Sequence, residues 1–193
     1  MNKKSTIEKI KKNFFNSDII RLNPHESHGF YDQTINIGFG LTDFHSIEEV
    51  EENDLNDDHI ENLLHEMSHL LVETSTACFS ETNWGYGQRT VDSKKILELT
   101  IEKEARIMNY TYRLLEYYKV DNWNMSEVDY ADIMTNGLIK TLKDYFKNSH
   151  PDNLDEIVFD AILDDLRNYC PTIEAIKKIW NKKIKLLEEE RNY

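Results

Sequence analysis

Two histidines and a glutamate stand close together in the chain, in the order His65-Glu66-Met67-Ser68-His69. In a helix, side chains at positions i and i+4 project from the same face, so both imidazoles can bind one metal ion. Glu66 would then lie beside the remaining coordination position, where it can act as general base on a zinc-bound water. The H-E-x-x-H spacing therefore predicts a catalytic zinc site with one Zn²⁺ per chain, and with it the chemistry of a metalloprotease.

A zinc site of this kind needs a third protein ligand. Carboxylates on the next predicted helix are the candidates, and Glu98 and Glu102 share one face of that mostly apolar helix. A carboxylate embedded there requires a cation or a hydrogen-bond partner. Glu104 falls on a different side when the helix is projected at about 100° per residue. We therefore expect Glu102 to be the third ligand, with Glu98 as the alternative and Glu104 outside the site. An ion pair between Glu102 and Arg106 is the competing interpretation.

The helix that carries the histidines is predicted from about Asp57 or Asp58, either of which can cap it, to about Ala77. Both histidines lie almost opposite its apolar stripe, which is formed by Ile60, Leu63, Leu64, Met67, Leu70 and Leu71. Residues 78–91 are expected to form a loop or short hairpin. Further helices are predicted at about 5–16, 92–118, 126–148, 152–169 and 171–190, and the third of these begins with a capping-box-like Ser126–Asp129.

One segment is typical of a strand. From Thr34 to Phe39, apolar Ile35, Ile37 and Phe39 alternate with other residues. We therefore expect an α+β fold that is mainly helical, with a small sheet packed on the active-site helix. The 193 residues suit a single domain. Within it, about 25–118 would form the core around the site and about 120–193 a helical extension.

The charge of the chain is unevenly distributed. Its net charge is −13, and the segment Leu22–Gln88 holds 14 of the 36 acidic residues and no Lys or Arg. Such a segment repels a phosphate backbone and can attract a basic peptide or a cation, so we expect no direct binding of nucleic acid.

No apolar run approaches the ~20 residues that span a bilayer, and no secretory h-region is present. Cys78 and Cys170 are too few for a disulfide framework, so a cytoplasmic protein is expected.

The two motifs together resemble a known family. H-E-x-x-H is followed some thirty residues later by Glu102-Lys103-Glu104-Ala105, and this resembles the gluzincins, above all the ImmA/IrrE-type metallopeptidases, whose later motif is roughly E-x-x-A-N-x-F-A. In that alignment Glu102 matches the third zinc ligand. The segment Gly29–Phe39 resembles the family's strand before the active-site helix. The resemblance covers about residues 25–115 and implies a zincin-like fold.

The resemblance also implies a substrate. In such enzymes the strand is a sheet edge that pairs with an extended peptide, so Thr34, Ile35, Asn36 and Ile37 are candidate substrate-binding residues. An endopeptidase acting on an intracellular, regulatory protein is the implied activity. Tyr86 and Tyr110 are candidate donors to the oxyanion of the transition state.

Two other functions fit the sequence. An acidic, phage-like protein could mimic DNA or bind a host factor, with zinc structural or vestigial. A helical interaction protein without metal is the third interpretation. The substrate and the oligomeric state stay open.

Overall fold

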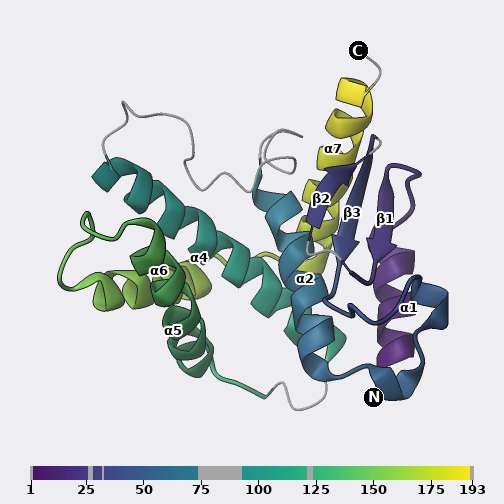
Figure 1. The fold of residues 1–193 in the computed structure, drawn as a ribbon, viewed down its shortest axis with the longest axis horizontal. Helices are drawn as coiled ribbons and strands as arrows, with labels where there is room; N and C mark the ends of the chain where they lie inside the picture. Colours follow the sequence, from purple (N-terminus) through teal and green to yellow (C-terminus); the bar gives the residue numbers. More distant parts are fainter. Residues whose placement is uncertain (1, 26–27, 32, 74–92, 121–123, 192–193) are drawn as a thin grey trace.

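The computed structural model describes residues 2–25, 28–31, 33–73, 93–120 and 124–191 of the chain (Figure 1). Over these residues the protein is mainly helical and carries one small sheet, as the predicted α+β class requires. None of the described helices combines the length and the apolar character that crossing a membrane demands.

The helices agree closely with those predicted from the sequence. Their bounds are α1 (Lys3–Phe14), α2 (Asp57–Val72), α4 (Ser93–Tyr118), α5 (Glu127–Tyr145), α6 (Leu154–Asn168) and α7 (Ile173–Arg191), with two short 3-10 turns, η1 (Ile47–Glu49) and η2 (Glu52–Asp54), before α2. The predicted cap of α5 is confirmed, since the Ser126 side chain accepts a hydrogen bond from the backbone N–H of Asp129.

The ends of α2 differ from the prediction. Asn56, rather than Asp57 or Asp58, is its N-cap, and the Asn56 side chain accepts a hydrogen bond from the backbone N–H of His59. The helix ends at Val72, because Glu73 has an extended backbone conformation. The loop expected at 78–91 falls outside the described residues.

The sheet has three strands, β1 (Ile20–Asn23), β2 (His28–Tyr31) and β3 (Thr34–Gly38), in the spatial order β1-β3-β2. The predicted strand is confirmed as β3, but its expected place at a sheet edge is wrong. β3 runs parallel to β1 and antiparallel to β2, so both of its edges are paired. Thr34, Ile35, Asn36 and Ile37 therefore have no free backbone edge to offer an extended peptide. The prediction failed because the flanking strands, four residues each, are too short to show a clear alternation.

Two apolar cores meet at α4. The first joins α1, the sheet, α2, α7 and the last turns of α4, and the second joins α5 and α6 with another side of α4, from Leu97 to Tyr112. In Figure 1, α2 lies between the sheet and α4, while α5 and α6 lie on the far side of α4. The long helix α4 is thus buried on two sides, as its apolar residues around most of its circumference predicted.

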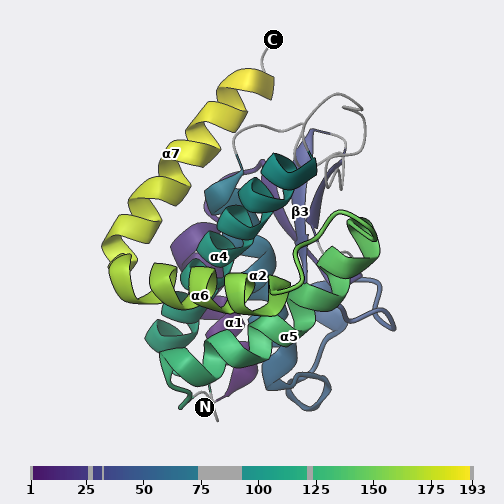
Figure 2. The same ribbon diagram turned by 90° about the vertical axis from the view of Figure 1, so that its left-hand side faces the viewer.

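The last helix, α7, packs against the first helix, α1. Trp180 of α7 is fully buried, packs edge-on against Phe14 of α1 with ring centroids 5.4 Å apart, and donates its indole N–H to the Phe14 carbonyl at 2.7 Å. Figure 2 shows α7 leaving the end of α6 and rising along the side of the molecule. The segment 120–193 is therefore divided: α5 and α6 build the second core, and α7 completes the first.

Candidate metal centre

The structure brings His65 and His69 of α2 together with Glu104 of α4. One potential ligand atom of each residue lies within 4.8 Å of those of the other two. The two imidazole rings have centroids 5.0 Å apart and are nearly perpendicular. His65 is half-buried, whereas His69 and Glu104 are buried. At this spacing the three side chains could hold one metal ion.

The third member of this group differs from the residue predicted. Glu98 and Glu102 are both exposed and do not belong to the group, whereas Glu104 is only 4% exposed. The physical reason is that α4 has two buried sides. One side packs on α2 and the other on α5 and α6, and the side that faces α2 is that of Glu104.

A buried hydrogen bond fixes how α2 and α4 lie against each other. The Thr111 hydroxyl of α4 donates to the Ser68 hydroxyl at 3.1 Å, and neither residue is exposed. Thr111 follows Glu104 by seven residues, two helical turns, and so lies on the same face of α4. Ser68 directly precedes His69. The contact therefore lies between the same faces of α2 and α4 that bring His69 and Glu104 together.

The site concentrates negative charge in a buried place. Glu66, Glu73 and Glu104 are only 7%, 5% and 4% exposed. Burial raises the pKa of the Glu104 carboxyl; nearby His69 and Lys103 lower it, and the charges of Glu73 and Glu66 raise it further. Buried carboxylates are stable only when cations or hydrogen bonds compensate them. A divalent cation between the two imidazoles and Glu104 would supply such compensation, so these residues fit a zinc ion.

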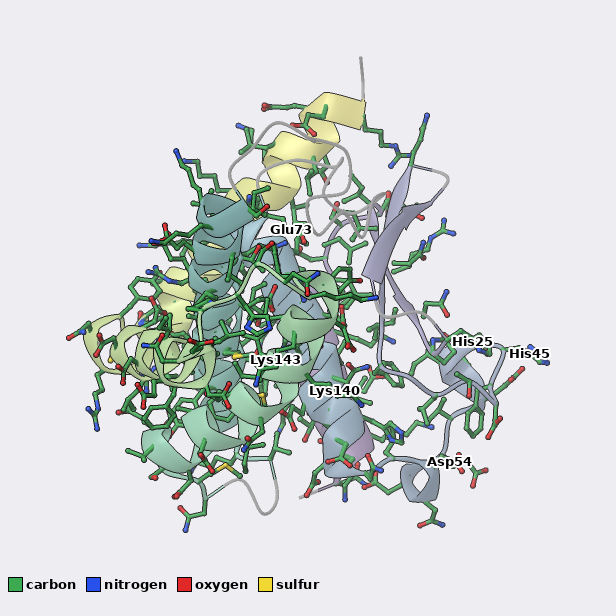
Figure 3. The ribbon with its side chains drawn as sticks, turned by 60° about the vertical axis from the view of Figure 1, so that its left-hand side comes forward. His25, His45, Asp54, Glu73, Lys140 and Lys143 are labelled. Carbon is green, nitrogen blue, oxygen red and sulfur yellow. The ribbon has the colours of Figure 1, made fainter. Side chains whose placement is uncertain are left out.

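Glu73 is a residue that sequence reasoning missed. Its carboxylate lies 3.5 Å from Nδ1 of His69 and 3.1 Å from the ammonium of Lys103 on α4. Its position four residues after His69 repeats the spacing of the two histidines and was the available signal. In Figure 3, Glu73 lies near α4, well away from His25 and His45.

Other residues considered from the sequence do not join the site. The Tyr110 hydroxyl is hydrogen-bonded to that of Tyr169 at 2.7 Å, and burial raises the pKa of Tyr110. Six residues after Glu104, it lies roughly 240° around the helix, so it is not aimed at the histidines. Tyr86 and Cys78 fall outside the described residues. His59 takes part in the cap of α2, where its Nδ1 accepts the backbone N–H of Asn56.

Comparison with known proteins assigns no family. No family model matches the chain, and no match was found among curated proteins or solved structures. Function is therefore inferred from the side chains of the site.

Proposed function

We propose that this protein is a zinc-dependent endopeptidase in which His65, His69 and Glu104 hold the ion and Glu66 is the general base. The observation that carries the proposal is the convergence of two imidazoles from one helix and a carboxylate from the next on one buried point. Two histidines and a glutamate are an established donor set of catalytic zinc sites, in which a fourth position stays open. The H-E-x-x-H part of the gluzincin resemblance supports the same function, and so does the placing of a small sheet, α2 and α4 around the site. The later motif does not support it, because its alignment puts Glu102 at the third ligand, where the structure has Glu104.

The role of Glu66 follows from its place. When bound, zinc would supply Lewis acidity and lower the pKa of a water to about 7. Glu66 follows His65 directly and is near enough to Glu104 to raise the pKa of that carboxyl. A buried carboxylate at this point can accept a proton from the attacking water and deliver it to the leaving amine of the peptide.

An extended substrate would pair with an edge strand of the sheet. Among the described strands these are β1 and β2, and we place the substrate along β2 because it carries the Gly29–Tyr31 part of the family resemblance. A peptide laid on β2 would gain backbone hydrogen bonds that do not depend on its sequence.

Specificity would come from charge. Exposed carboxylates surround the turns before α2, at Asp43, Glu48, Glu49, Glu51 and Asp58. The segment that holds them has no Lys or Arg to neutralise them. We therefore propose a substrate with a basic stretch that contacts these turns, and the family resemblance suggests a regulatory protein.

Metal content tests the site. We expect one zinc per chain, by elemental analysis, in the wild type and in Glu102→Ala, and its loss in Glu104→Ala. The two variants remove the same group from the same helix, two residues apart, so Glu102→Ala is the matched control. Zinc that survives Glu104→Ala and is lost with Glu102→Ala would overturn the assignment.

Catalysis needs a separate test with Glu66→Gln. This variant should keep its zinc and lose at least about 100-fold of its activity against a peptide library enriched in Lys and Arg, because the general base is gone. Unchanged hydrolysis would refute the mechanism. If the wild type cleaves nothing and instead binds a basic partner in a salt-sensitive way that Glu66→Gln leaves intact, the acidic binding protein is the better description.

A further inference from the structure

We propose that Glu73 is a positioning residue of the metal centre, which orients the imidazole of His69 by accepting its Nδ1–H. The inference rests on the proposed zinc site. It adds Glu73, which lies outside the H-E-x-x-H motif and is not one of the three proposed ligands. The observation is an ion-pair contact of 3.5 Å between Nδ1 of His69 and Oε1 of Glu73, both in buried side chains, which would close to a hydrogen bond in the metal-bound site.

An imidazole has two ring nitrogens, and the partner of one decides how the other is presented. A carboxylate beside Nδ1 favours the tautomer with a proton on Nδ1, which leaves Nε2 as the ligand atom for a metal. Carboxylates at this position are a recurrent companion of metal-bound histidines, because they fix the ring and raise its basicity.

The end of α2 holds Glu73 in this place. As the C-cap of α2, it donates its backbone N–H to the His69 carbonyl at 2.8 Å, so its backbone cannot drift from the histidine. The same carboxylate oxygen also lies 3.1 Å from the ammonium of Lys103. Lys103 directly precedes Glu104 in α4, so the segment of α4 that faces the metal site also contacts this carboxylate.

A purely structural role is the competing explanation, because the Glu73–Lys103 ion pair also ties α2 to α4. The chain allows the two roles to be separated. Lys103→Met removes the ion pair and keeps the carboxylate beside His69. Glu73→Ala removes both, and Glu73→Gln keeps an oxygen that can still accept the Nδ1–H while it removes the charge.

The experiment measures the zinc affinity of the full chain by competition with a chromophoric chelator, together with the visible absorption of the Co²⁺-substituted protein. Glu73→Ala should weaken zinc binding about 10- to 100-fold and alter the Co²⁺ bands. Glu73→Gln should recover part of the affinity, and Lys103→Met should change it less than about threefold. Thermal unfolding of each metal-free variant checks that it is folded.

The outcomes separate this inference from the proposed function. If the wild type binds no zinc, the metal centre and the role of Glu73 fall together. If the wild type binds zinc and Glu73→Ala binds it equally well, only the positioning role is overturned. An equal loss of affinity in Lys103→Met and Glu73→Ala would assign the effect to the helix contact and also overturn it.

Discussion

Glu61 offers a quantitative test of how α2 is buried. It lies one turn before His65, on the side of α2 near Tyr130, a fully buried residue of α5. Burial, and to a smaller extent the charge of Asp58, raises the pKa of Glu61 from about 4.5 to about 7. The perturbation is Glu61→Gln, which keeps the size of the side chain and removes its titration.

The sign follows from the direction of the pKa change. The folded protein binds the Glu61 proton more tightly than the unfolded chain, so this contribution to stability is present below pH 4.5 and is lost as the pH rises through about 7. A difference of one in pKa corresponds to about 1.4 kcal/mol, so the full difference corresponds to about 3 kcal/mol. Since Glu61 is only half-buried, solvent screening reduces the expected effect to about 1–2 kcal/mol.

The assay is urea unfolding of metal-free wild type and Glu61→Gln at pH 5 and pH 8. At pH 5, just above the ordinary pKa of a glutamate, only about a quarter of the difference should be present, so the variant should be more stable by about 0.3–0.5 kcal/mol. At pH 8 the variant should be more stable by about 1–2 kcal/mol. Glu98→Gln, on the exposed side of α4, controls for the loss of one negative charge. A difference between wild type and Glu61→Gln that is the same at both pH values would refute the reasoning.

Three further predictions concern packing and metal. Trp180→Ala should lower the free energy of unfolding by about 3–5 kcal/mol in urea, because it empties a fully buried indole site. Thr111→Val should cost about 1–2 kcal/mol in the same assay, because it removes the buried bond between α2 and α4 and leaves the Ser68 hydroxyl without that partner. A chelator should lower the melting temperature of zinc-loaded wild type, since zinc at 100 times its Kd adds about 2.7 kcal/mol, and should leave that of Glu104→Ala unchanged.

The helices could be predicted from the sequence because they carry apolar residues at helical spacing, and in α5 because Ser126 is a good N-cap. The proximity of His65 and His69 could also be predicted, because residues four positions apart share one face of a helix whatever surrounds that helix. The sheet could be predicted only in part. β3 has a clear alternation of buried isoleucines, while the neighbours that place it at the centre are short.

The third member of the metal site could not be chosen from the sequence, because a helical projection gives angles and not neighbours. Glu102 and Glu104 lie about 200° apart around α4, on opposite sides. Choosing between them requires knowing which buried side meets α2, and that depends on where α5 and α6 pack. Polar residues on α4 do not separate the two, because Asn109 follows Glu102 by two turns, Thr111 follows Glu104 by two turns, and both are fully buried.

The contact between α7 and α1 affects when the first core can form during synthesis of the chain. Phe14 and Trp180 are separated by 166 positions in the chain. At about 5–20 residues per second, a ribosome completes Trp180 about 10 to 30 seconds after Phe14. Throughout this interval the apolar surfaces of α1 and α2 that α7 covers are exposed on the growing chain. The newly made N-terminal half is therefore expected to depend on chaperones that bind exposed apolar surface, until the last helix emerges and closes the core.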